Sequence, residues 1–180
     1  MKPMYVMALA SLLYLPAKAQ TFMTRNGKVN FYSKTPLEDI KAENRQVVAA
    51  FDLSKKTVAL TLLQKNFLFE KQLMQDHYNE NYVESDKFPK AQFTGTINGN
   101  VGTTPGTYKV QISGNLTLHG VTKPVSAPAE FEVADGKVTG KADFKVKPSD
   151  FDIKIPSLVK DKIASEITVQ VVAACAALSK

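Results

Sequence analysis

Residues 107–118 read TYKVQISGNLTL, a run in which apolar and polar side chains alternate. Successive side chains of a β-strand point to opposite faces of the sheet, so a spacing of two gathers the apolar ones on one face. This run therefore predicts a strand with one dry and one wet face. The dry face carries Tyr108, Val110, Ile112, Leu116 and Leu118.

The same alternation continues through most of the chain, in runs separated by short polar turns. Turn signals stand at 98–106, 134–137 and 147–150. Connections this short favour antiparallel strands, because parallel strands need long crossovers. About eight such strands predict a β-sandwich or an up-and-down barrel, and a barrel leaves no exposed sheet edge. The further runs cover 29–31, 47–53, 58–62, 93–97, 125–133, 138–146, 151–155 and 167–173.

The first residues, 1–19, have the three parts of a secretory signal peptide. Lys2 precedes an apolar run at 4–15, and Ala17-Lys18-Ala19 is an A-x-A cleavage site. The run is too short to span a bilayer, so we expect no stable membrane insertion. Cleavage after Ala19 would leave 20–180 as a single exported domain, periplasmic or secreted. The alternative interpretation is an ordinary buried N-terminal segment.

Charge and cysteine content exclude two kinds of protein. Removal of Lys2 and Lys18 lowers the formal net charge from +6 to +4, because two lysines leave with the signal peptide. The remaining lysines are scattered and are not interleaved with aromatic residues, so nucleic-acid binding is not expected. Cys175 is the single cysteine, which excludes an internal disulfide. Its small, apolar neighbours predict a buried, unreactive thiol.

Two segments depart from the strand pattern and predict short helical turns. Residues 36–46 place Leu37 and Ile40 three apart, and residues 70–82 place apolar side chains at intervals of three and four. A third short helical turn is expected within 155–166.

The dry faces mix bulky side chains with small ones. Small inward residues in a barrel of about eight strands leave room for one small ligand. Glycines can instead relieve strain where strands bend, so the pattern leaves both interpretations open. Few charged residues share this parity, and a cavity would therefore suit a long hydrocarbon. The small residues are Ala49, Gly95, Gly99, Gly114, Ala127, Ala129, Gly140 and Ala142.

Inward parity also gives the residues that we expect to line such a cavity. Any contacts to a polar head group are expected from His77, Tyr78, Asn79 or Asn81. The expected apolar lining is Phe31, Phe51, Leu60, Leu62, Phe67, Phe69, Phe93, Ile97, Val110, Ile112, Leu116, Phe131 and Phe144.

The polar segment 73–93 admits three interpretations: a lid over the barrel mouth, a ligand contact, or a catalytic or metal site. His77 with Asp76 or Glu80 could exchange protons, but no nucleophile motif accompanies them. A durable metal site needs three or four ligands, so neither a metal nor another cofactor is expected. The other histidine, His119, precedes a glycine at a strand end. We expect it to fix the turn by bonding a backbone group or a carboxylate.

Four segments, in the right order, resemble the YceI-like family. LMQDHYNENYVESDKFPKAQF at 73–93 resembles its "LM..HFNENYMESDKYP.A.F" stretch, and GNLTLHGVTKPV at 114–125 resembles its "G.LTLHGVTK.V" stretch. VNFYSKTPLEDIKAEN at 29–44 and FKVKPSDFDIKIPSLVKDKIASEITVQV at 144–171 are similar to its opening and ending. Tyr78 and Val83 replace a frequent Phe and Met, and they keep an aromatic ring and an apolar chain at these positions.

The resemblance implies an all-β, antiparallel, lipocalin-like barrel exported to the periplasm. It implies binding of a long apolar molecule such as a polyisoprenoid, an isoprenoid quinone or a fatty-acyl lipid, and it brings no catalytic residues. Two alternatives remain: a lipid-modifying enzyme using His77 with Glu80 or Asp76, and a ligand-free structural or stress-response barrel. A homodimer is left open.

Overall fold

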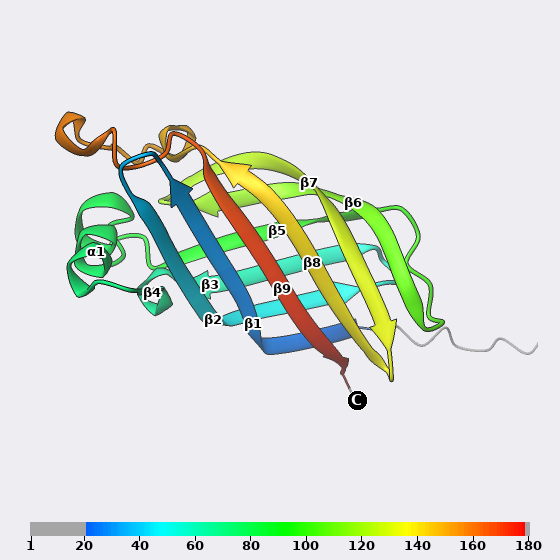
Figure 1. The fold of residues 1–180 in the computed structure, drawn as a ribbon. Coiled ribbons are helices and arrows are strands. Elements are labelled where there is room, and N and C mark those ends of the chain that lie inside the picture. Colours follow the sequence, from blue (N-terminus) through cyan, green and yellow to red (C-terminus); the bar gives the residue numbers. More distant parts are fainter. Residues whose placement is uncertain (1–20, 179–180) are drawn as a thin grey trace, which may run out of the picture.

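The structure, a computed structural model, describes residues 21–178, and the expected signal peptide at 1–19 lies outside them. Nine strands account for most of the described chain (Figure 1). Their bounds are β1 (Thr21–Lys34), β2 (Asp39–Asp52), β3 (Thr57–Leu63), β4 (Leu68–Phe69), β5 (Lys90–Asn98), β6 (Gly106–Leu118), β7 (Val121–Ala134), β8 (Lys137–Val146) and β9 (Ile167–Ala177).

The strands form one antiparallel sheet that closes on itself. Its order is β1-β9-β8-β7-β6-β5-β3-β2, and β1 pairs with β2 to complete an eight-stranded barrel. The two-residue β4 adds to β2 outside this ring, where Ala42 pairs with Phe69. The predicted antiparallel barrel is confirmed, and closure leaves no long unpaired edge in the ring.

The helical prediction for 70–82 is confirmed. An α-helix, α1 (Gln72–His77), leads directly into a π-helical turn, η2 (Tyr78–Tyr82), at one end of the barrel (Figure 1). Three short 3-10 turns complete the secondary structure: η1 (Gln64–Asn66), η3 (Pro148–Phe151) and η4 (Ser157–Val159). Within residues 21–178, no helix is both long and apolar enough to cross a membrane.

The helical prediction for 36–46 is wrong. Thr35 closes a tight turn by accepting hydrogen bonds from the backbone of Leu37 and Glu38, and β2 begins immediately afterwards at Asp39. The spacing of Leu37 and Ile40 therefore comes from a turn joined to a strand. Residues 151–155 were predicted as a strand, but they form the end of η3 and an extended loop. In the third predicted helical segment, 155–166, the one helical turn is η4.

A buried asparagine fixes an irregularity in the barrel wall. The register of β1 and β2 shifts on either side of Gly27, so the inward parity of β2 changes between Asn44 and Val47. The Asn44 side chain is fully buried and donates to the Leu63 carbonyl at 2.9 Å. It also accepts from the Gln46 amide at 2.9 Å. Asn44 thus satisfies the bulged backbone and joins β2 to the point where β3 ends.

One half of the barrel interior is filled. Near the β7–β8 turn, Phe51 and Phe131 meet edge to face with ring centroids 5.0 Å apart, within a cluster of buried residues from all eight strands of the ring. Cys175 belongs to this core, and burial raises the pKa of its thiol to about 12. The predicted burial of Cys175 is confirmed.

The glycines serve close packing in the barrel wall. Gly95 and Gly114 face each other across β5 and β6, and a Cβ on Gly114 would lie 2.5 Å from the Gly95 Cα. A Cβ on Gly140 would lie 2.8 Å from the Phe51 ring. These glycines allow close approaches of neighbouring atoms, whereas Ala127 and Ala142 line the cavity.

Gly114→Ala should destabilise the barrel by about 1–3 kcal/mol, because the added methyl group meets backbone that cannot turn aside. The free energy of unfolding in urea measures the loss. Asn115→Ala, at the neighbouring exposed position on β6, is the control and should change it by less than about 0.5 kcal/mol. Equal effects of the two substitutions would contradict the close approach of β5 and β6.

Candidate ligand-binding cavity

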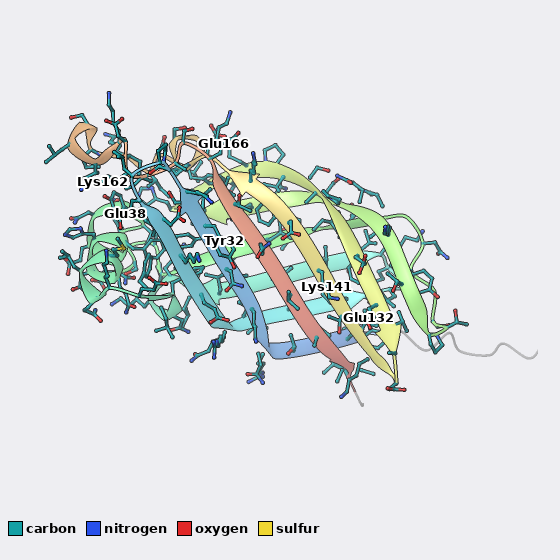
Figure 2. All side chains as sticks on the ribbon, in the orientation of Figure 1. Tyr32, Glu38, Glu132, Lys141, Lys162 and Glu166 are labelled. Atoms are coloured by element: carbon teal, nitrogen blue, oxygen red, sulfur yellow. The ribbon has the colours of Figure 1, made fainter. Side chains whose placement is uncertain are left out.

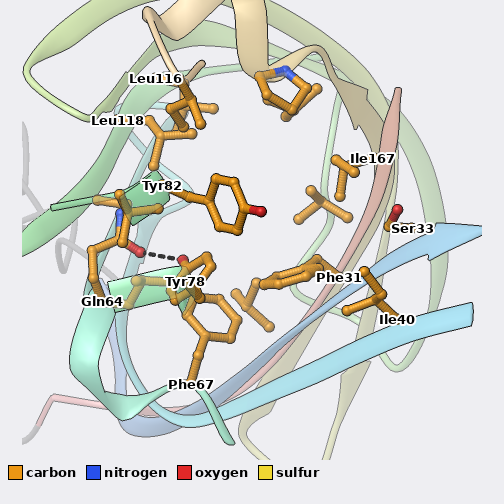
Figure 3. A pocket seen from close by; sticks show the side chains of 18 of the residues that line it. Phe31, Ser33, Ile40, Gln64, Phe67, Tyr78, Tyr82, Leu116, Leu118 and Ile167 are labelled. Carbon is orange, nitrogen blue, oxygen red and sulfur yellow. Dashed lines mark hydrogen bonds between the residues drawn. The ribbon is translucent and has the colours of Figure 1, made fainter. Parts of the chain in front are cut away.

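The other half of the barrel contains a cavity of about 410 Å³ (Figure 3). All eight strands of the ring contribute side chains to its wall, and α1 and η2 contribute the cover at the end of the barrel. The wall is overwhelmingly apolar, and the volume falls in the range of small-molecule sites in proteins. Water molecules find few hydrogen-bond partners in such a space, so the cavity favours an apolar guest.

The structure places most of the expected lining residues around this cavity. Four of them lie elsewhere: Phe51, Ile97 and Phe131 are buried in the filled half of the barrel, and Val110 packs against that core. Strand parity identifies the inward face but does not say which half of the barrel a residue occupies. The residues on the cavity wall are Phe31, Leu60, Leu62, Phe67, Phe69, His77, Tyr78, Phe93, Ile112, Leu116 and Phe144.

Sequence reasoning missed several lining residues. Ile163 and Gln64 lie in turns, where alternation carries no information about direction. Gln64 in particular reads as an ordinary polar residue between two strands, yet its side chain is 1% exposed. Ile167 and Val169 do alternate, so the periodicity of β9 could have included them.

The cover is formed by residues 72–85, which we call the lid. Tyr78 holds it to the barrel, because its ring packs against Phe31, Phe67 and Phe69 with centroids 5.1–5.7 Å apart. Aromatic pairs at this spacing contribute about 0.5–1.5 kcal/mol each beyond their burial. The Tyr78 hydroxyl donates to Gln64 Oε1 at 2.7 Å, and burial raises the pKa of this hydroxyl, so it remains a donor.

A second anchor joins the end of the lid to the β6–β7 turn. His119 Nε2 lies 2.8 Å from the Glu84 carboxylate, and Nδ1 lies 3.0 Å from the Phe151 carbonyl oxygen. Both partners can accept a hydrogen bond from a ring nitrogen of the imidazole. The expected role of His119 in fixing the turn is confirmed. His119 and Glu84 both have positive φ angles, 51° and 45°. The contacts therefore hold both residues in a backbone conformation that non-glycine residues rarely adopt.

The candidate acid–base group of the lid is dispersed. Asp76 accepts a hydrogen bond from Gln72 at 2.7 Å, while His77 and Glu80 are exposed. His77 lies on the cavity wall, at its outer end. Among residues 21–178, no group of three or more His, Cys, Asp and Glu side chains is placed to hold a metal ion.

Several polar and charged side chains line the cavity near the lid, among them Glu38, Lys162, Tyr82 and Gln64. The Tyr82 hydroxyl points into the middle of the space, and burial raises its pKa (Figure 3). The Gln64 amide forms part of the wall beside Tyr78. Across the cavity, the Ser33 hydroxyl accepts a hydrogen bond from the Ala164 amide at 2.8 Å.

A family model described as "YceI-like domain" matches residues 18–174. The chain belongs to the YceI-like family. A UPF0312 protein of Vibrio parahaemolyticus is 34% identical over 80 residues, and protein YceI of Salmonella arizonae is 41% identical over 78 residues. Each match covers about two fifths of this YceI-like chain, 41% and 40%, and spans 40% and 38% of the relative's own length.

Solved structures share the barrel of this YceI-like protein at low sequence identity. A polyisoprenoid binding domain from Saccharophagus degradans superposes with a TM-score of 0.76 at 13% identity, covering 89% of this chain and 100% of that one. Burkholderia cenocepacia BcnA gives a TM-score of 0.70 at 18% identity, covering 82% and 95%. These likenesses establish the fold.

The Glu84–His119 anchor predicts a loss of stability in acid. The hydrogen bond from His119, helped by Lys87, lowers the pKa of the Glu84 carboxyl below its usual 4.5. A carboxyl with a lower pKa in the folded state stabilises that state above its unfolded pKa, and the stabilisation disappears as pH falls through the folded pKa. Glu84→Gln should lower the urea midpoint at neutral pH and flatten its fall below about pH 4.5.

The matched control is Glu80→Gln, an exposed carboxylate in the same lid. Its urea midpoint should follow the wild-type pH curve at every pH. A Glu84→Gln variant with an unchanged pH dependence would show that the anchor does not stabilise the fold.

Proposed function

We propose that this YceI-like protein binds a long apolar molecule in the barrel cavity and sequesters or carries it in the periplasm. The observation that carries this proposal is the apolar cavity of about 410 Å³ between the filled core and the lid. Each Å² of apolar surface removed from water contributes about 25 cal/mol, less the cost of ordering the guest. The proposed contacts are the lining residues named above, with Phe31, Phe93 and Ile112 at different depths.

The solved relatives support this class of guest. One of them is a polyisoprenoid binding domain, and a polyisoprenoid, an isoprenoid quinone or a fatty-acyl lipid would present the same kind of long apolar surface. Binding is favoured over catalysis because the polar side chains around the lid serve to hold it. Tyr78 is bonded to Gln64, and Glu84 is bonded to His119.

Filling the cavity should remove the guest while keeping the barrel. Ala142 lies on the cavity wall in β8, so Ala142→Phe projects a ring into the space. We expect native mass spectrometry and solvent extraction to find a bound hydrophobe in the wild type. Ala142→Phe should hold at least about tenfold less of it, a loss of about 1.4 kcal/mol in binding.

Asp143→Phe is the matched control, because it adds the same ring on the exposed face of β8. It should retain the wild-type amount of bound hydrophobe. The proposal fails if folded Ala142→Phe protein retains the guest undiminished, or if the wild type neither contains a hydrophobe nor binds an added one.

Export is tested separately from binding. The sequence of residues 1–19 predicts cleavage after Ala19, so the intact mass of the protein from the periplasmic fraction should correspond to a chain beginning at Gln20. Ala19→Arg, which removes the small residue at the cleavage site, should leave the leader attached. Wild-type protein that keeps Met1 and remains in the cytoplasm would contradict the proposed location.

A further inference from the structure

Four exposed leucines gather at the end of the barrel that holds the cavity. Leu158 is 92% exposed, Leu37 67%, Leu73 65% and Leu68 61%. They come from four separate segments: η4, the β1–β2 turn, α1 and β4. Figure 1 shows these segments at the same end of the barrel, with η4 drawn in orange, and the β7–β8 turn at the other end. We call these four leucines the rim.

The rim adjoins the wall of the cavity. Leu73 itself lines the cavity, and so do the chain neighbours of the other three leucines, Glu38, Phe69 and Val159. The apolar surface therefore leads from the inside of the barrel to its outside. Single exposed leucines are common on proteins, but a group of them around an apolar cavity indicates an interaction site.

The loop that carries Leu158 is positively charged. Residues 154–163 contain three lysines and one aspartate, a formal net charge of +2. Lys160 and Lys162 are exposed, and neither forms an ion pair with another of the residues 21–178. Figure 2 shows Lys162 at the rim end of the barrel. Leu158 thus stands in water beside two lysines that are free to meet an anion.

The acidic residues at this end have basic neighbours or lie on another segment. Glu38 is 3.4 Å from the Lys71 ammonium group, and Asp39 pairs in register with Lys34 across β1 and β2. Positive charge is therefore concentrated on the η4 loop, and the side of the lid is acidic. The further acids on and beside the lid are Glu70, Asp76 and Glu80.

We propose that the rim docks on a lipid bilayer with anionic head groups, with the η4 loop in front. Leu158 enters the boundary between head groups and acyl chains, while Lys160 and Lys162 lie against lipid phosphates. Contact through so few side chains is reversible. Docking in this orientation places the cavity entrance on the bilayer, so a guest passes between them without crossing water. This role in guest exchange rests on the proposed function, whereas the docking itself does not.

The shape of the rim favours a bilayer over a protein partner. A stable protein interface buries about 800 Å² of well-packed surface on each side. The rim consists of separate projections from four segments around an opening, and a fluid bilayer adapts to such projections. Lysines on the same projection as a leucine suit the bilayer further, because their apolar stems can lie in the interface while the ammonium groups stay at the phosphates.

Flotation with vesicles tests the docking. Vesicles contain phosphatidylcholine alone or equal amounts of phosphatidylcholine and phosphatidylglycerol. The wild type should float with the anionic vesicles and much less with the neutral ones. Leu158→Ser should weaken binding to the anionic vesicles by about fivefold, because one leucine no longer leaves water. Leu178→Ser is the matched control: it is 56% exposed and follows β9 at the filled end of the barrel, so binding should stay at the wild-type level.

Equal binding by Leu158→Ser and Leu178→Ser, or equal binding of the wild type to both kinds of vesicle, would overturn the inference. Extraction of the same samples separates this failure from that of the proposed function. Wild-type protein that contains its hydrophobe but binds no vesicles overturns the docking alone. Vesicle binding by a protein that never takes up a hydrophobe supports the docking and contradicts the proposed function.

The lysines are tested by a double variant. Lys160→Gln with Lys162→Gln should weaken binding to the anionic vesicles by about tenfold or more, since each lysine near such a surface contributes about 1 kcal/mol. Lys109→Gln with Lys137→Gln removes the same charge from exposed positions on β6 and β8 and should have a much smaller effect. Equal losses in the two double variants would show a general effect of net charge and overturn the inference.

A fluorescence measurement distinguishes a bilayer from a second copy of the chain. The sequence contains no tryptophan, so a single introduced one reports its own surroundings. The emission of Leu158→Trp should shift to shorter wavelength with anionic vesicles, because indole rings settle at the membrane interface, and that of Leu178→Trp should not. A shift that grows with protein concentration in the absence of vesicles would identify a second copy as the partner and overturn the inference.

Discussion

The pairing of β1 with β2 is the constraint on which the molecule depends, because it closes the sheet into a ring of eight strands. A ring of that size encloses a limited volume, which side chains can fill or a small guest can share. Here the two uses are separated along the barrel axis. Phe51 and Phe131 fill one half, and the residues around Phe31 leave the other half open. The filled core and the open cavity therefore use largely different side chains of the same strands, and Ile112 and Ala127 belong to both.

The lid shows why a polar segment can belong to an apolar site. Its tyrosines point inwards, and its carboxylates and amides either face water or hold the backbone. The helix has a wider π-helical turn at Tyr78. Its carbonyl accepts a hydrogen bond from the amide of Val83, five residues later, at 2.9 Å. Such turns are uncommon and often mark functional sites. Together with the His119 contacts, this turn sets the positions of Tyr78 and Tyr82 at the cavity.

Much of the fold could be predicted from periodicity, since alternation at Val110 and Ile112 identifies a strand and its inward face. Alternation cannot say how far along the barrel a residue lies, which is why Phe131 was expected on the cavity wall and belongs to the core. The helix expected at 36–46 failed because a turn joined to a strand imitates helical spacing. Gln64 was not predictable, because its importance comes from burial by segments distant in the chain.

The filled half of the barrel limits how a guest could enter and leave the cavity. The core around Phe131 fills one end of the barrel, so a guest bound as proposed would enter and leave at the other end, beside α1. Such a dead-end tube accepts a chain only to a fixed depth. Any length beyond that depth stays outside the entrance, where water or another surface must accommodate it. A barrel that binds as proposed would thus limit the depth of its guest from the inner end, and exchange with a donor or acceptor would take place at one rim.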